Sequence, residues 1–532
     1  MENKLKIQDF SVKNKTIFIH ISCYTEYDPN VLEPKLKMLI DNGYENIILP
    51  IINIRKDKAH FQNLEFLEFK HHYSIDNLFM NKNWKKAKIS FFLTYGENLI
   101  KNIELDSKIL HKKKLKYSIK FCYENKNLSI YLKKDLNKKS IRSFLYFIQS
   151  ISLKESTSNL KLLRKTFLNE IYQIMKKILK KKNRVLFISE RGSKLTGNLK
   201  FVYDDLQKHE SIKTEISSSK ESFKSSSIKH KILTCVKMAK SEVIILDNYF
   251  EPINYFNFKN QFVLQLWHAC GAFKTFGFTR AGRPGAPDMA SSAHRKYNNV
   301  IVSSTNVVNC YAEAFGVSKE VVLPLGIPRT DIFFDNSYSK SIKDEFYKKY
   351  PNLKNKKIIL FAPTFRGGRR ETAYYPIDAF NPVKIYNRLN KEYVIVLKYH
   401  LFIKESFKVP EEYSDSIISI SADKDINDLL FIADIVITDY SSLIFESSLL
   451  NLPMLFYTFD LDSYISKRGF YFEYNDFVPG KIVYSQDELI ESIKNKDFEE
   501  FKLKSFKNKF FDNLDGKSTE RVSKLILDKI KK

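Results

Sequence analysis

Residues 433–457 show most clearly how apolar and polar positions alternate along this chain. Ile435 to Ile437 is a short apolar run without polar alternation, which predicts a strand buried on both faces. Thr438 to Ser442 follows, and residues of these types end strands and begin helices. Residues 443–450 predict a helix, and residues 454–457 predict the next strand. The order strand, turn, helix, strand indicates a βαβ unit of a parallel sheet.

The same alternation runs through residues 184–532 in two blocks. We expect strands in both blocks at Arg184 onward, Val243 to Leu246, Gln261 to Trp267, Asn299 to Ser303, Glu320 to Leu323, Lys357 to Ala362 and Tyr393 to Leu397. We therefore predict an α/β fold with two doubly wound parallel-sheet lobes, residues 184–335 and 336–532. Ligands of such sheets bind outside the carboxyl ends of the strands, so a cleft between the lobes is the expected site.

The residues before position 184 follow other patterns. Across residues 1–140, short apolar or alternating runs bounded by Asn, Asp and Lys predict a β-rich accessory domain. Within residues 141–183, apolar side chains recur at spacings of three and four among lysines and arginines, namely Leu160, Leu163, Phe167, Ile171, Ile174 and Ile178. This spacing predicts a basic amphipathic helix. The helix could lie in an anionic membrane interface or pack as a linker between two domains.

Charge adds information about partners. The 532 residues carry a net charge of +27, and residues 1–182 hold about 36 Lys and Arg against about 18 Asp and Glu. The excess predicts an acidic partner, unless the lysines serve only for solvation. Five scattered cysteines without CxxC spacing indicate a reducing compartment. No apolar run approaches the roughly 18 residues of a spanning helix, so we expect a cytosolic protein or one on the cytosolic face of a membrane.

Two histidines follow predicted strands, one in each lobe. His268 comes after residues 261–267, and His400 comes shortly after residues 393–397. Both side chains are expected to face the cleft, because the carboxyl ends of the strands lie there. Imidazole is the natural general base near neutral pH, although a lone histidine is more often structural. Their matching positions favour a functional pair.

Basic and hydroxyl side chains in neighbouring loops predict an anion site. Arg329 and Arg366 suit bidentate contacts with phosphate, and Lys398 supplies a point charge. Ser441 and Ser442 stand at the start of the predicted helix 443–450, where free N–H groups and the positive dipole end favour phosphate. The alternative is that Ser441 only caps that helix. Together these groups suffice to hold a diphosphate without a metal.

Glu446 lies one helical turn after Ser442. A carboxylate at that position disfavours phosphate but could accept hydrogen bonds from a ribose diol. The chain has no HExxH motif, and its carboxylates do not suggest a metal site, so we expect neither a metal nor a cofactor. A basic module that binds nucleic acid is an alternative from charge alone, but it would leave both histidines unexplained, and no helix-turn-helix or RNP signature is present.

Several motifs together resemble one family. They are SERGSKLTGN (189–198), WHACGAFKTFG (267–277), LPLGIPRTDIF (323–333), ILFAPTFRGG (359–368), LKYH (397–400), ITDYSSLIFE (437–446) and RGFYFEY (468–474). In this order they are similar to the successive signatures of the CDP-glycerol glycerophosphotransferases, the teichoic acid and capsule polymer synthases. The resemblance covers about residues 184–500.

The resemblance implies a GT-B-type fold and a peripheral position on the cytoplasmic face of the cell membrane. It also implies transfer of glycerol phosphate from CDP-glycerol to the terminal hydroxyl of a lipid-linked acceptor, with release of CMP and no role for nucleic acid. His268 then falls on the family's catalytic base and His400 on its second essential histidine. Donor-site positions of the family fall on Arg329, Pro363, Thr364, Lys398, Ser441, Ser442 and Glu446, and we place Gly271 and Arg366 with these binding residues.

Three departures from the family pattern concern the substrates. The family often has His-Gly-Thr-Pro where this chain has His268 to Gly271, Asp where it has Glu446, and Arg-Met-His where it has Lys398 to His400. The first departure leaves the polyol open, because ribitol phosphate transferases that use CDP-ribitol belong to the same family. A sugar transferase of the same architecture that uses a UDP-sugar is the remaining enzymatic alternative.

Overall fold

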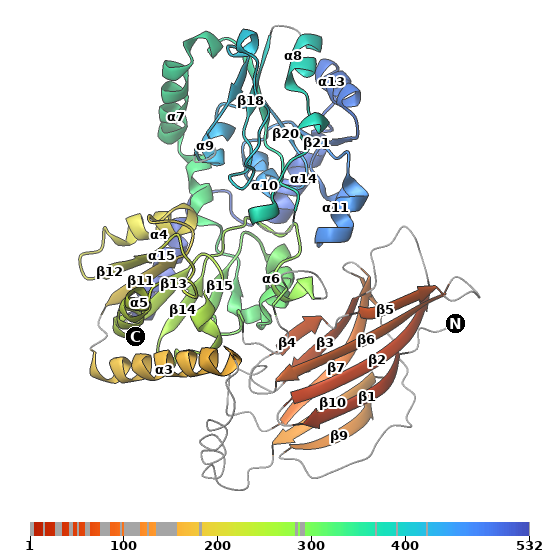
Figure 1. The fold of residues 1–532 in the computed structure, drawn as a ribbon, viewed down its shortest axis with the longest axis vertical. Coiled ribbons are helices and arrows are strands. Elements are labelled where there is room, and N and C mark those ends of the chain that lie inside the picture. The colour runs from red at the N-terminus through yellow and green to blue at the C-terminus, as the bar shows by residue number, and fades with distance from the viewer. Residues whose placement is uncertain are drawn as a thin grey trace.

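The structure is a computed structural model. It describes ten strands between residues 5 and 134, and then residues 157–179, 183–281, 286–287, 293–367, 370–389, 392–421 and 424–530. Two α/β lobes, each built around a parallel sheet, make up the part after residue 183 (Figure 1). The predicted fold class is confirmed.

The first lobe contains a six-stranded parallel sheet in the order β12-β11-β13-β14-β15-β16. Its strands are β11 (Arg184–Ser189), β12 (Lys213–Ser218), β13 (Val243–Leu246), β14 (Phe262–Gln265), β15 (Asn299–Ile301) and β16 (Val322–Leu323). Its helices include α4 (Gly197–Leu206), α5 (Ile228–Lys240) and α6 (Val308–Phe315). The central strands β13 and β14 are apolar except for Gln265, because helices cover both faces.

The second lobe repeats the plan with the order β19-β18-β17-β20-β21-β22. Its strands are β17 (Lys357–Phe361), β18 (Tyr393–Leu397), β19 (Ile417–Ser419), β20 (Ile435–Thr438), β21 (Met454–Tyr457) and β22 (Lys481–Val483). Its helices are α7 (Asn336–Lys349), α8 (Pro382–Arg388), α9 (Ile426–Leu430), α10 (Leu443–Leu449), α11 (Leu461–Arg468), α12 (Tyr474–Phe477), α13 (Gln486–Lys494) and α14 (Phe501–Phe510). The βαβ unit predicted at residues 433–457 is β20, α10 and β21.

The last helix of the chain returns to the first lobe. In α15 (Ser518–Ile530), Val522 and Ile526 are buried in the same core as Leu199 of α4 and Val185 of β11. Asp331 holds the start of α15, since it accepts hydrogen bonds from the backbone N–H groups of residues 518 and 519. The chain therefore crosses between the lobes twice.

A segment of the first lobe is hydrogen-bonded to the second. The backbone N–H of Tyr471 donates to Phe273 O at 2.9 Å, and that of Thr275 donates to Gly469 O at 3.1 Å. Between them, Lys274 and Phe470 form an isolated antiparallel bridge. The Phe273 ring stacks on Phe470 and Phe477 at 4.8 Å each. This backbone pairing fixes residues 273–275 of the first lobe at the surface of the second.

The ten strands between residues 5 and 134 form two antiparallel sheets, in the orders β1-β2-β6-β5 and β4-β3-β7-β10-β9, and β8 pairs with β7. They are β1 (Leu5–Lys13), β2 (Thr16–Glu26), β3 (Lys35–Asp41), β4 (Asn46–Pro50), β5 (Asn53–Lys58), β6 (Leu64–Ser74), β7 (Lys86–Tyr95), β8 (Asn98–Ile100), β9 (Tyr117–Glu124) and β10 (Asn127–Lys134).

Helix α3 (Thr157–Ile178) occupies most of the segment predicted as a basic amphipathic helix, and residues 141–156 lie outside the described residues. Tyr172 is buried and stacks on Phe256 at 4.8 Å, so the helix packs on the first lobe. Ile174 and Ile178 of the same apolar series are 53% and 70% exposed. No helix in the described ranges is both long and apolar enough to span a membrane.

Candidate functional site

His268 stands just beyond the carboxyl end of β14, and the structure determines its tautomer. Its Nδ1 lies 3.0 Å from the carbonyl oxygen of Asp247, at the end of the neighbouring strand β13. A carbonyl can only accept, so Nδ1 carries the proton and Nε2 keeps its lone pair. Burial, and then the positive charge of Arg191, lower the pKa of His268 to about 4. The imidazole is therefore neutral near pH 7 and can accept a proton at Nε2.

The backbone before His268 is held in an unusual conformation. Trp267 has a φ of 52°, in the left-handed region that a bulky residue rarely adopts. Asn198 of α4 donates to the carbonyl oxygens of residues 266 and 267 at 3.2 and 3.0 Å. The Trp267 N–H donates to Gln265 Oε1 at 2.9 Å. These two buried amides offset backbone strain of roughly 1–3 kcal/mol and hold His268 in place.

His400 has the opposite tautomer. The backbone N–H of Phe402 donates to its Nδ1 at 3.2 Å, so Nδ1 is the acceptor and the ring proton resides on Nε2. Its ring contacts Phe365 and Phe402, with centroids 4.8 and 4.7 Å away. Burial lowers the pKa of His400 to about 4, and the charges of Lys274, Lys398 and Arg191 add to this shift. A neutral His400 presents an N–H donor, whereas His268 presents an acceptor.

Arg191 connects the two histidines electrostatically. It lies in the loop after β11, and its charge lowers the pKa of both imidazoles although they belong to different lobes. The same loop is tied to β13, because Ser189 Oγ accepts from the Arg191 N–H and donates to Asp247 Oδ2 at 3.3 Å. The charge of Arg191 therefore acts on one histidine of each lobe, and a shared cleft for the two imidazoles stays a prediction.

Arg329 and Glu446 pair with each other across the two lobes. The Arg329 guanidinium, from the 3₁₀ segment η5 (Pro328–Phe334), forms a salt bridge with the Glu446 carboxylate of α10. Both side chains are largely buried, at 13% and 4% exposed. The carboxylate raises the pKa of Arg329 despite the burial. The two predicted donor-site residues thus neutralise each other in this state.

Arg366 lies in a buried ion cluster. Its guanidinium pairs with Asp439 at 2.6 Å and with Asp460 at 2.7 Å and also donates to Thr364 O, and four of its five N–H groups are used. Several aromatic rings surround it within 5.3 Å, those of Tyr375, Tyr440, Phe459 and Tyr464. This geometry favours a structural role for Arg366 over the phosphate contact that the sequence suggested.

The remaining predicted binding residues gather around the same strand ends. Lys398 is 7% exposed, and its Nζ donates to Ser421 O at 2.6 Å. Pro363 and Thr364 are buried, and the Thr364 N–H donates to Asp439 Oδ1 at 2.7 Å. Ser441 Oγ accepts from the backbone N–H of Leu443 at 3.2 Å. Ser441 and Ser442 are partly exposed directly before α10.

Gly271 owes its identity to packing between the lobes. Its φ is +63°, and a Cβ at this position would lie 2.3 Å from the Phe445 ring of α10. Overpacking of this kind costs about 1–3 kcal/mol, so Gly271→Ala is expected to lower the free energy of unfolding by about that amount, measured by denaturant titration. Gly192→Ala is the matched control, because its nearest neighbour is 3.9 Å away. Equal stability of the two variants would contradict this assignment.

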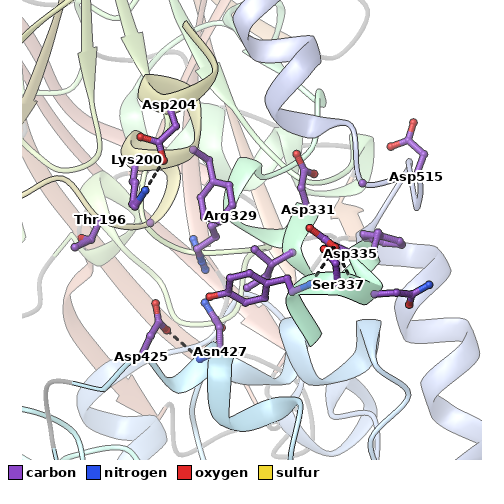
Figure 2. A pocket seen from close by; sticks show the side chains of 17 residues that line it. Thr196, Lys200, Asp204, Arg329, Asp331, Asp335, Ser337, Asp425, Asn427 and Asp515 are labelled. Atoms are coloured by element: carbon purple, nitrogen blue, oxygen red, sulfur yellow. Dashed lines mark hydrogen bonds and ion pairs between the residues drawn. The ribbon is translucent and has the colours of Figure 1, made fainter. Parts of the chain in front are cut away.

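A cavity of about 730 Å³ opens beside Arg329 at the junction of the lobes. Its lining comes from α4, from η5 and the start of α7, and from residues 425–427 at the start of α9. Figure 2 shows Arg329 between the α4 side chains and those of Asp425 and Asn427. The cavity adjoins the Arg329–Glu446 ion pair, so a ligand that separates this pair could extend into it. Within the described ranges, no group of three or more His, Cys, Asp or Glu could hold a metal ion.

Comparison with known proteins decides the family. Residues 170–528 match the family described as CDP-Glycerol:Poly(glycerophosphate) glycerophosphotransferase. The chain belongs to this family. The resemblance inferred from the motifs is therefore confirmed, and it covers both lobes of the glycerophosphotransferase fold.

Two relatives in this glycerophosphotransferase family come from Bacillus spizizenii. The teichoic acid poly(ribitol-phosphate) polymerase is 41% identical over 373 residues, which are 69% of this chain and 60% of the polymerase. The teichoic acid ribitol-phosphate primase is 33% identical over 383 residues, 68% of this chain and 97% of the primase. The chain thus spans less than two thirds of the polymerase.

The fold has a solved counterpart. The structure of the wall teichoic acid polymerase TagF superposes with a TM-score of 0.57 at 21% identity, over 74% of this chain and 99% of that one. At this identity the likeness shows the fold alone, and it supports the GT-B-like arrangement of the two lobes.

Sequence reasoning assigned no specific role to several residues around the two histidines. Asn198 and Asp247 hold His268, while Arg191 and Lys274 add charge near His400. Arg191, Asn198 and Lys274 fall inside quoted motifs, and Asp247 stands at the end of a predicted strand. Their positions in these motifs or at a strand end could have marked them as candidates, but only the fold shows which side chains and backbone groups they contact.

Proposed function

We propose that this chain transfers a polyol phosphate from a CDP-linked donor to the hydroxyl of an acceptor and releases CMP. The observation that carries the proposal is the pair of histidines with opposite tautomers at the strand ends of the two lobes. One imidazole accepts a proton and the other donates a hydrogen bond, which are the two functions that attack on a phosphate and departure of CMP require.

In the proposed reaction, the acceptor hydroxyl gives its proton to Nε2 of His268. Its oxygen forms a bond to the polyol-side phosphorus of the donor. The bond from that phosphorus to the bridging oxygen breaks, and its electron pair leaves with CMP. The Nε2–H of His400 and the Lys398 ammonium stabilise the charge on the leaving phosphate, together with the Ser441 and Ser442 hydroxyls.

The nucleoside is proposed to lie near Glu446. Separation of the Arg329–Glu446 pair would free the carboxylate for a ribose diol and the guanidinium for a phosphate. The adjoining cavity of about 730 Å³ has room for a pyrimidine ring. The sequence suggested glycerol phosphate, whereas both Bacillus relatives are named for ribitol phosphate. Both CDP-glycerol and CDP-ribitol therefore serve as donors in the assay.

The acceptor is proposed to be a polyol-phosphate or glycan chain linked to a lipid at the cytoplasmic face of the membrane. The excess of basic residues supports an anionic product and an anionic surface. Exposed Ile174 and Ile178, beside Lys177 on α3, support peripheral contact with such a surface.

One assay tests the activity. The purified full chain is incubated with a lipid-linked acceptor and CDP-glycerol, CDP-ribitol or a UDP-sugar, and the released nucleotide is measured. We expect CMP from a CDP-polyol and no UDP from UDP-sugars. Release of UDP without CMP would favour the sugar transferase, and no nucleotide release from any donor would contradict the proposal.

A further inference from the structure

The predicted phosphate cations are largely committed to other partners. Arg329 is paired with Glu446, and Arg366 is paired with Asp439 and Asp460. A guanidinium whose charge and donors are already used contributes little to an incoming phosphate unless its carboxylates leave. Cations without a carboxylate partner are therefore better suited to hold the transferred phosphate.

Arg191 and Lys274 are basic side chains that remain available there. In the part of the chain that the structure describes, neither cationic group forms an ion pair or a hydrogen bond. Arg191 is exposed in the loop after β11, and Lys274 is half-buried. Both belong to the first lobe, and the charges of both act on His400 of the second lobe.

The position of Lys274 is fixed by backbone pairing between the lobes. It forms the antiparallel bridge with Phe470, and hydrogen bonds of its two neighbours with residues 469 and 471 flank that bridge. Phe273 packs against Phe470, and successive side chains of an extended segment point to opposite sides. Lys274 therefore points away from this packing, and the charges of Lys274 and Asp439 act on each other, as does the charge of Lys274 on His400.

We propose that Arg191 and Lys274 contact the oxygens of the phosphate that is transferred, Arg191 between the two histidines and Lys274 on the His400 side. The inference rests on the proposed function and adds two catalytic residues to it. The acceptor oxygen approaches from His268 and the CMP oxygen departs toward His400. Arg191 lies in the loop that Ser189 ties to Asp247, the residue whose carbonyl holds His268, so its long side chain can reach a phosphorus held between the two imidazoles.

The reason for two cations is the charge of the transition state. Negative charge spreads over the non-bridging oxygens of the transferred phosphoryl group, and preorganised donors at those oxygens lower the barrier. Lys398 is tied to Ser421 O in the second lobe. Arg191 and Lys274 approach from the first lobe, so the phosphate is enclosed only when both lobes contribute.

The test uses steady-state CMP release by the full chain with the CDP-polyol that the wild type uses. Removal of one preorganised donor costs about 10²–10³-fold in kcat, so Arg191→Gln and Lys274→Met are each expected to lower kcat by about that factor. The KM for the donor should change less than kcat. Lys194→Gln is the control, since it is an exposed cation three residues from Arg191. Thermal unfolding of each variant shows whether the fold is intact.

The pH profile separates a charge role from a structural one. Lys274 faces Asp439, Arg468, Arg366 and His400, and burial lowers its pKa to about 8. Its ammonium is charged below that pH, so kcat should fall as the pH rises above about 8. Lys274→Arg keeps the charge at higher pH, so it should retain activity and lose this alkaline decline.

The outcomes distinguish the two proposals. If the wild type releases no CMP from either CDP-polyol, the proposed function and this assignment fall together. If the wild type is active and both Arg191→Gln and Lys274→Met keep its kcat, only the assignment of the two cations is overturned. A loss of kcat in folded Arg191→Gln, with Lys194→Gln unchanged, supports it.

Discussion

Replacement of His268 with alanine is expected to lower the rate of CMP release by about 10²–10⁴-fold, the usual contribution of a general base. The reason is geometric, because Nδ1 is bound to the Asp247 carbonyl and Nε2 is the atom left to accept a proton. Steady-state CMP release with the CDP-polyol that the wild type uses measures the effect. His209→Ala, at an exposed position, is the control.

The pH dependence of the same reaction provides a second readout. Burial and Arg191 lower the pKa of His268 to about 4, so the base is neutral and competent above that pH. The kcat/KM of the wild type should therefore stay level from neutral pH down to about 5 and fall as the pH approaches 4. Wild-type rates of CMP release in His268→Ala would show that another group takes the proton.

Local sequence pattern predicted the parallel-sheet fold well, for a physical reason. A strand covered on both faces must be apolar along its whole length, so runs such as Ile435 to Ile437 stand out from the polar turns after them. The carboxyl ends of parallel strands meet at one edge of the sheet, so the positions of His268 and His400 shortly after predicted strands led us to expect both at the cleft.

The partners of those residues could not be predicted in the same way. Arg366 follows a predicted strand, as a phosphate ligand would, but Asp439 and Asp460 reach it from 73 and 94 residues away in the sequence. Gly271 was placed with the substrate-binding residues, whereas the group that approaches it in the fold is Phe445. Spacing along the chain predicts which edge of a sheet a residue occupies, whereas its pairing depends on contacts between distant segments.

The same limit applies to charge. The net charge of +27 predicted an anionic partner but not which cations would meet it. Arg329 and Arg366 have carboxylate partners within the fold, whereas Arg191 and Lys274 have none within ion-pair distance among the described residues. We infer that Arg366 holds the second lobe in shape, that Arg329 stays paired across the junction until a donor separates it from Glu446, and that Arg191 and Lys274 are available to substrate.

Arg366→Met is expected to lower the free energy of unfolding by about 3–5 kcal/mol, because it leaves Asp439 and Asp460 in a largely buried site without their cation. Denaturant titration measures the change. Arg388→Met is the matched control, since Arg388 pairs with Asp487 and Glu491 at the surface and such pairs contribute about 0–1 kcal/mol.

The double variant with Arg366→Met and Asp439→Asn tests whether the lost stability comes from the carboxylates left without a cation. Adding Asp439→Asn to Arg366→Met removes one of the two uncompensated carboxylates, so it should recover part of the lost stability, and the two changes should not be additive. The Thr364 N–H and Tyr440 N–H can still donate to the amide oxygen at position 439. An unchanged stability of Arg366→Met together with a raised KM for the CDP-linked donor would instead favour the phosphate contact that the sequence suggested.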